Sequence, residues 1–296
     1  MEKGRLLVFG LGYSGGATAR AARASGWEVT VVTRGPARAE AQALAQGGIG
    51  VVPFADPAAL AGATHLLATA APEGTGDPVL AAHGEAIAAA PGLRWLGYLS
   101  TTGVYGDRSG AWVDEATVPA PGQDRSRRRL AAEQAWETVA RRGGASLDLI
   151  RLAGIYGPGR SALDDVRSGR ARRIVKPGHA FGRIHVADIA GLALAAMARP
   201  APGMRVLHGA DDLPAPSAEV IAEAARLLGL PPPPEVPFED AARTMSPMAL
   251  SFWAENRKVA NAATKTATGW TPRYPTYREG LAAILTEQRR ESPAEQ

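Results

Sequence analysis

The sequence of 296 residues contains no cysteine. This absence excludes disulfide bonds, thiolate nucleophiles and zinc sites with sulfur ligands. The five histidines show no spacing with carboxylates that is typical of a metal site, so we expect no bound metal. No stretch approaches the roughly 20 apolar residues that span a bilayer, so we expect no membrane partner.

The sequence also lacks a recognisable secretory leader, because Met1–Gly4 is followed by only a short apolar run. We therefore expect a cytoplasmic protein. The net charge of +4 is mild and by itself favours neither a nucleic acid nor a membrane surface. With 46% hydrophobic residues, the chain is long enough for one large α/β domain and a smaller C-terminal part.

A glycine-rich turn between two short apolar runs is the most informative feature present. The first run is Leu6–Phe9, an alanine-rich segment follows the turn, and the second run is Val29–Val32. In this strand–turn–helix–strand context the glycines permit a tight turn, a close approach to a pyrophosphate and helix–strand packing. The free N–H groups at the helix start favour the negative phosphates. We therefore expect a dinucleotide at the six turn residues, which are Gly10, Leu11, Gly12, Tyr13, Ser14 and Gly15.

Apolar runs continue to alternate with alanine-rich segments through the first half of the chain. The further apolar runs are Ile49–Phe54, His65–Thr69, Trp95–Ser100 and Leu147–Leu152. The alanine-rich segments are Ala37–Ala45, Val79–Ala90 and Arg127–Arg142. This alternation predicts parallel strands joined by crossover helices, which is an α/β Rossmann fold with a doubly wound parallel sheet.

The character of the sequence changes at Gly157, where loops rich in Gly, Pro and Arg begin. We expect residues 1–156 to form a dinucleotide-binding Rossmann domain. Residues 157–296 would form a smaller C-terminal substrate-binding lobe, with residues 187–208 returning to the Rossmann part. Thr276–Arg290 is predicted to be the final helix, and Arg289–Gln296 a frayed polar tail.

The end of the second strand bears on the choice of cofactor. An acidic residue there would accept a hydrogen bond from the ribose 2′-OH of NAD and repel the 2′-phosphate of NADP. This chain has Thr33 at that place, followed by Arg34 and Arg38, and arginine pairs well with phosphate. The pattern favours NADP. In the alternative interpretation both arginines only solvate a surface loop, and NAD is accepted as well.

Further motifs extend the pattern to the rest of the chain. They are Leu99–Asp107, Arg151–Arg160, Phe181–Ala190 and Thr268–Pro272. Together they resemble the extended branch of the short-chain dehydrogenase/reductase superfamily, the NAD(P)-dependent epimerase/dehydratase relatives, nearly from end to end. The resemblance implies cofactor contacts at Ala70, Ala71 and Ser100. It also implies that Thr101 binds the reacting oxygen, and that His185 and Asp188 have structural roles.

The resemblance has one clear departure, at the catalytic Tyr-x-x-x-Lys. Aligning Leu130–Glu133 with the family puts Arg125 at the tyrosine position and Arg129 at the lysine position. Arginine stays protonated, so it cannot exchange a proton as the tyrosine does. This combination resembles the atypical subgroup of the superfamily, which lacks the tyrosine. Tyr156, His185 or a water held by Thr101 are the alternative proton donors.

Arg125, Arg129 and Glu133 are spaced to share one helix face. In one interpretation they form a solvated stripe that contributes little to stability. In the other, Arg125 or Arg129 enters the cleft and holds the cofactor ribose or an anionic substrate. The sequence leaves both open.

The segment from Arg151 to His185 contains eight Lys or Arg residues and only two acidic residues. We expect a substrate that carries a phosphate or a carboxylate, bound by Thr102, Tyr156, Arg160 and Arg183. A solubilising surface is the alternative. Nucleic acid is disfavoured, because the segment has few aromatic residues and no known binding module.

These features predict an NAD(P)-binding oxidoreductase or epimerase/dehydratase-like enzyme that acts on a small molecule. The alternative is a non-catalytic NAD(P)H sensor, in which the lost tyrosine means lost chemistry. Extended relatives often dimerise through helices that flank the active site, so a homodimer is compatible with the resemblance.

Overall fold

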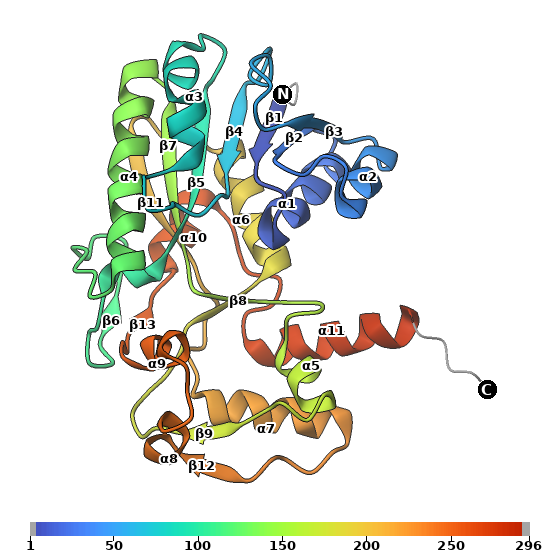
Figure 1. The fold of residues 1–296 in the computed structure, drawn as a ribbon, viewed down its shortest axis with the longest axis vertical. Helices are drawn as coiled ribbons and strands as arrows, with labels where there is room; N and C mark the ends of the chain where they lie inside the picture. The colour runs from blue at the N-terminus through green and yellow to red at the C-terminus, as the bar shows by residue number, and fades with distance from the viewer. Residues whose placement is uncertain (1–3, 292–296) are drawn as a thin grey trace.

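Seven parallel strands form the central sheet in the part of the chain that the computed structural model describes, residues 4–291 (Figure 1). Their order in space is β11-β7-β5-β4-β1-β2-β3. The direction of winding reverses between β1 and β4, which is the place where a doubly wound sheet opens a crevice for ligands. The structure confirms the predicted Rossmann fold. The strands are β1 (Arg5–Phe9), β2 (Glu28–Thr33), β3 (Gly50–Pro53), β4 (His65–Ala68), β5 (Trp95–Thr101), β7 (Ser146–Leu152) and β11 (Met204–Gly209).

Helices cover both faces of the sheet, as the near-continuous apolar strands require. Alternate residues of β1 point to opposite faces: Leu6 and Val8 belong to one buried cluster, and Leu7 and Phe9 to the other. The first cluster lies under α1 (Tyr13–Ala24), α2 (Ala39–Gln46) and α6 (Val186–Ala198). The second lies under α3 (Pro78–Ala89) and α4 (Asp124–Gly143) (Figure 1).

A smaller lobe lies beyond the carboxyl ends of the strands (Figure 1). Its core includes Tyr156 and Tyr277 and is built mainly by three helices, α5 (Ala162–Arg167), α7 (Ser217–Leu228) and α11 (Tyr277–Glu291). Three short parallel pairs complete it: β8 (Gly154–Tyr156) with β10 (Arg183–His185), β9 (Arg173–Val175) with β12 (Glu235–Pro237), and β6 (Trp112–Val113) with β13 (Lys258–Val259). The remaining helices are η1 (Thr102–Tyr105), α8 (Phe238–Ala242), α9 (Pro247–Trp253) and α10 (Ala262–Thr268).

Two boundaries differ from the sequence-based expectations. Helix α4 begins at Asp124, three residues before the predicted start, and Asp124 in its first turn suits the positive end of the helix dipole. The frayed tail expected from Arg289 is wrong for Arg289 and Arg290, which continue α11. Residues 292–296 of that expected tail lie outside the described residues. None of the helices in the described chain is long and apolar enough to cross a membrane.

Candidate functional site

The glycine-rich turn between β1 and α1 has the geometry that its sequence implies. Gly10 has φ +107°, a backbone conformation that other residues rarely adopt. A Cβ atom at Gly15 would lie 2.2 Å from the carbonyl oxygen of Gly10, so only glycine lets the helix pack this closely. A Cβ atom at Gly12 would meet nothing within 4 Å. The backbone at Gly12 therefore faces open space and leaves room for a ligand.

Helix α1 begins at this open space. Its N-cap residue is Gly12, which has no side chain to bond to the N–H groups of the first turn. The first turn contains no acidic residue, and Arg23 lies in the last turn. The N–H groups and the positive end of the helix dipole are thus available to an anion, as a bound diphosphate would require.

The residues expected to recognise the cofactor's ribose, Thr33, Arg34 and Arg38, lie at the end of β2 and in the loop that leads to α2. The Thr33 hydroxyl is buried and accepts a hydrogen bond from the Gly35 N–H at 3.1 Å. The Arg34 guanidinium is exposed and donates to the carboxylate of Glu73 at 3.1 Å. Glu73 follows β4 and was missed by sequence reasoning, because only the fold brings the two loops together.

Arg129 points into the protein, whereas Arg125 lies half-buried against the exposed side of α9. Arg129 donates to the carbonyl oxygens of Ala70 and Leu99 at 3.3 and 3.0 Å, and to the Tyr98 hydroxyl at 3.0 Å. The Arg125 guanidinium lies 4.2 Å from the ring centroid of Phe252. The solvated-stripe interpretation is therefore wrong for Arg129. The helix face packs inward because β5 ends directly beneath it.

Glu133, the third residue of that face, is 2% exposed and pairs with Arg151 rather than with Arg129. Arg151 donates to both carboxylate oxygens of Glu133, at 3.1 and 2.7 Å, and Ser100 donates to one of them at 2.5 Å. The hydroxyl of Ser100, expected at the cofactor, is thus engaged beneath the site. This buried network fixes the strand end that carries Thr101.

The network continues through Tyr105 to His208. Arg151 donates to the Tyr105 hydroxyl at 2.8 Å. His208 Nδ1 lies 2.6 Å from the carbonyl oxygen of Ala260, which can only accept, so Nδ1 carries the proton. The Nε2 atom of the neutral ring then accepts from Tyr105 at 2.5 Å. Burial lowers the pKa of His208, in agreement with this neutral form.

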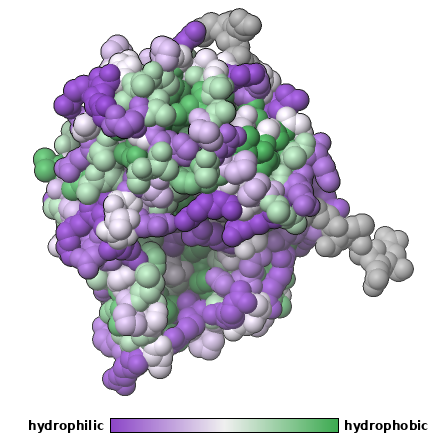
Figure 2. Space-filling model, turned by 45° about the horizontal axis from the view of Figure 1, so that its top comes forward, coloured by the Kyte–Doolittle hydropathy of each residue, from purple (hydrophilic) through white to green (hydrophobic). Residues whose placement is uncertain are grey.

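A cavity of about 630 Å³ lies between the sheet edge and the smaller lobe. It brings together all seven residues that the sequence proposed for catalysis and substrate binding, which are Thr101, Thr102, Arg125, Arg129, Tyr156, Arg160 and Arg183. It is also lined by Phe252, Trp253, Glu255 and Arg257. Sequence reasoning missed Phe252, Glu255 and Arg257, because they lie about 120 residues or more beyond Arg125 in the chain. Figure 2 shows a hollow between the upper and lower parts of the face in view, bordered above by hydrophilic side chains.

The cavity is rich in positive charge that lacks carboxylate partners. Of the five arginines that line it, Arg257 pairs with Glu255 at 2.7 Å. Within the described residues, the other four make no ion pair within 4 Å: Arg125, Arg129, Arg160 and Arg183. Unpaired guanidinium groups in a cavity attract phosphate or carboxylate.

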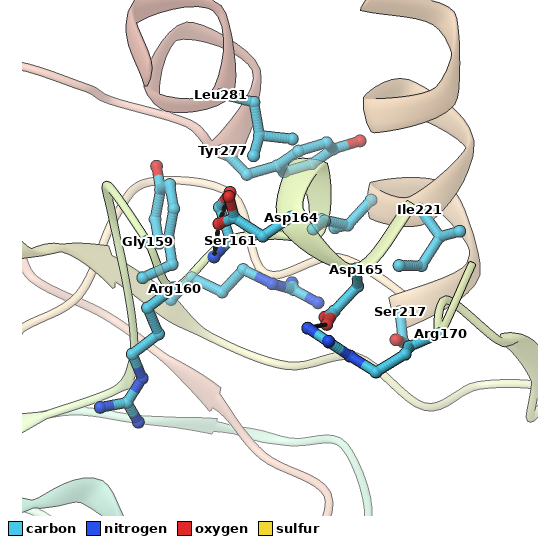
Figure 3. Close-up of a pocket in the computed structure, with 14 residues that line it drawn as sticks. Gly159, Arg160, Ser161, Asp164, Asp165, Arg170, Ser217, Ile221, Tyr277 and Leu281 are labelled. Atoms are coloured by element: carbon cyan, nitrogen blue, oxygen red, sulfur yellow. Dashed lines mark hydrogen bonds and ion pairs between the residues drawn. The ribbon is translucent and has the colours of Figure 1, made fainter. Parts of the chain in front are cut away.

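A second cavity of about 410 Å³ adjoins the first and shares Tyr156, Arg160, Arg183 and Ser217 with it. In Figure 3, Arg170 reaches toward Asp165, at 3.5 Å, while Arg160 points away from that pair. The hydroxyl of Tyr277 is buried here and has no hydrogen-bond partner in the described chain.

Two of the candidate proton donors are poorly suited to that role. Burial raises the pKa of Tyr156 far above its ordinary value, and its hydroxyl faces the Thr276 carbonyl oxygen at 3.5 Å. His185 caps α6 by accepting from the Ala187 N–H at 3.1 Å, and burial lowers its pKa to about 4. Asp188 accepts from the N–H groups of Arg273 and Tyr274, which agrees with a structural role for both residues.

Comparison with known proteins places this geometry in context. No family model matches the chain. A solved structure described as a functionally unknown conserved protein from Silicibacter pomeroyi DSS is 46% identical, with a TM-score of 0.88, over 97% of this chain and 99% of that one. The chain belongs to the family of this Silicibacter protein.

More distant structures share the fold. MoeE5 in complex with UDP-glucuronic acid and NAD is 21% identical, with a TM-score of 0.74, over 97% of this chain and 100% of that one. The human epimerase family protein SDR39U1 with NADPH is 22% identical, with a TM-score of 0.73, over 95% and 99% of the two chains. The chain thus shares the fold of these two NAD- or NADPH-bound proteins.

One curated relative gives a shorter match. A 3-diazoavenalumate denitrifying reductase from Streptomyces is 36% identical over 149 residues, which is 46% of this chain and 48% of the relative. The match therefore spans about half the length of that protein.

Proposed function

We propose that this protein is an NADP-linked oxidoreductase or epimerase/dehydratase-like enzyme that acts on an anionic small molecule without the usual catalytic tyrosine. One observation carries the proposal. The open helix start at Gly12 shares the carboxyl edge of the sheet with a cavity in which four arginines lack carboxylate partners. A dinucleotide and an anionic substrate could then meet at Thr101, which ends β5 and lines that cavity.

The residues present fit a nicotinamide dinucleotide. The turn from Gly10 to Gly15 would hold the diphosphate, and Thr33, Arg34 and Arg38 would surround the adenosine ribose. The backbone of Ala70 and Ala71 would line the site beside β4. When bound, the cofactor supplies or accepts a hydride. NAD remains an alternative, because MoeE5 was solved with NAD and SDR39U1 with NADPH.

The chain's own residues then bind and orient the substrate. Arg125 and Arg160, each stacked near an aromatic ring, would hold its phosphate or carboxylate. Thr101 would orient the reacting oxygen. Arg125 at the tyrosine position and Arg129 at the lysine position both stay protonated. Because burial also disfavours Tyr156 and His185 as proton donors, we assign the proton transfer to a water held at Thr101.

A non-catalytic sensor is the second candidate, and the position of Arg129 is compatible with it. Its guanidinium is bonded to the fold itself, through Ala70, Tyr98 and Leu99. A residue held in this way stabilises the site whether or not chemistry follows.

Turnover separates the two candidates. NADPH oxidation is followed with carbonyl compounds that carry a phosphate or a carboxylate, with uncharged analogues as the matched control. An enzyme oxidises NADPH faster with the anionic members, and replacing Arg125 by Ala reduces that advantage. A protein that binds the cofactor tightly, yet neither oxidises NADPH nor converts any member of the panel to a product in the presence of NADPH or NADP, is a sensor.

A further inference from the structure

Two loops that are far apart in the sequence meet beside the open helix start. Strands β2 and β4 flank β1 on its two sides, so the loops after them open on the same crevice as Gly12. Arg34 comes from the first loop and Glu73 from the second, and the Arg34 guanidinium donates to the Glu73 carboxylate at 3.1 Å. The pair thus spans the crevice between the two strand ends.

This place decides between the two dinucleotides in Rossmann folds. A carboxylate there accepts from the ribose 2′-OH, and an arginine there binds the 2′-phosphate. The acid is missing at the end of β2, where Thr33 stands. The structure supplies a carboxylate from elsewhere: Glu73 brings one into hydrogen-bond contact with the arginine that would bind the phosphate.

The backbone of Glu73 is held by local structure. Its N–H and carbonyl groups bond to Gly76 at 2.8 and 3.2 Å, and Gly76 has φ +113°. Directly after this turn, Asp77 caps α3 by accepting from Val79 and Leu80. The glutamate is therefore presented to Arg34 from a turn anchored to a helix. Arg38, by contrast, makes no ion pair within 4 Å among the described residues.

We propose that Glu73 is a specificity-determining residue. Its carboxylate competes with the 2′-phosphate of NADP for Arg34, and this competition reduces the selectivity of the site for NADP over NAD. The proposal rests on the proposed function, since it requires a nicotinamide dinucleotide in the crevice. The Arg34–Glu73 pair is exposed, and such a pair is weak, so a phosphate can displace it. NAD has no 2′-phosphate and leaves the pair in place.

The test measures the dissociation constants of NADPH and NADH by calorimetry for the wild type and for Glu73→Gln. The glutamine keeps the size of the side chain and removes the charge. We expect NADPH to bind about two- to fivefold more tightly, which corresponds to the loss of one exposed ion pair. The affinity for NADH should stay within about twofold. The matched control is Glu85→Gln, which removes the same charge from the exposed pair with Arg142, between α3 and α4, and should leave both constants unchanged.

A second background shows whether Glu73 acts through Arg34. In Arg34→Gln, which itself should weaken NADPH more than NADH, adding Glu73→Gln should no longer improve NADPH binding. If Glu73→Gln improves NADPH binding just as much without Arg34, Glu73 acts by direct repulsion of the 2′-phosphate, and the proposed competition for Arg34 is wrong. An unchanged ratio of the NADPH and NADH dissociation constants in the single variant Glu73→Gln would also contradict the proposal. If the wild type binds neither nucleotide, the proposed function fails rather than this inference alone.

Discussion

At the scale of single residues, the ion pair between Glu133 and Arg151 is the buried charge on which the site depends. Both side chains are at most 5% exposed. Removing one partner of such a pair leaves the other charged and unpaired in a medium of low polarity. Because Ser100 bonds to the same carboxylate, the pair also fixes the strand end next to Thr101.

Replacing Glu133 by Gln should therefore destabilise the fold by about 3 kcal/mol or more, since Arg151 would keep its charge. Urea unfolding followed by circular dichroism measures the change. Glu85→Gln is the control, and the exposed pair that it breaks should barely alter the midpoint. A variant of Glu133 as stable as the control would show that the buried pair does not stabilise the fold.

Asp211 gives a pH dependence with a definite sign. It is 1% exposed, and burial raises the pKa of its carboxyl group to about 7. The folded state then binds more protons than the unfolded state between about pH 4 and pH 7, so stability is lost as the pH rises through this window. Asp211→Asn removes the group that titrates. We therefore expect the melting temperature of the variant, relative to that of the wild type, to be higher at pH 8 than at pH 5. The same dependence of melting temperature on pH in both proteins would contradict the raised pKa of Asp211.

At the scale of elements, the turn between β1 and α1 separates folding from binding. An added Cβ atom at Gly15 collides with the backbone of Gly10, whereas one at Gly12 meets open space. The two glycines of one motif thus have different tasks, and matched alanine variants can tell them apart.

Gly15→Ala should lower the melting temperature of the free protein. Gly12→Ala should melt like the wild type yet bind NADPH about tenfold more weakly, a loss of about 1.4 kcal/mol. Thermal melting without ligand and calorimetry with NADPH give the two readings. If Gly12→Ala binds NADPH as the wild type does, the cofactor's diphosphate does not bind at the start of α1.

The same elements show what the sequence could predict. Strands such as β1 and β5 were recognisable because they are buried on both faces and therefore read as apolar runs. The start of α4 was missed, because Gln123 is not a typical N-cap residue. Helix α9 was missed because it is short and exposes Met248 and Phe252, so it shows no apolar periodicity.

The site could be predicted in its members but not in its contacts. The seven residues proposed for catalysis and substrate binding do line one cavity. The sequence could not reveal that Arg34 forms an ion pair with Glu73, or that Glu133 pairs with Arg151 and not with Arg129. Both pairings join residues from different elements, and only the packed sheet decides them.

At the scale of the whole molecule, the cavity between the sheet edge and the smaller lobe is the central feature. Its lining comes from both halves of the chain, from Thr101 to Val259. The division after residue 156, the homodimer and the cytoplasmic location stay predictions. The account as a whole depends on whether a nicotinamide dinucleotide occupies the crevice at Gly12.

Calorimetric titration of the full chain with NADPH and NADH tests this most directly, together with thermal melting in the presence of each nucleotide. The account predicts saturable heat and a raised melting temperature with NADPH, and weaker binding of NADH. Neither heat nor a melting shift with either nucleotide at saturating concentration would contradict it.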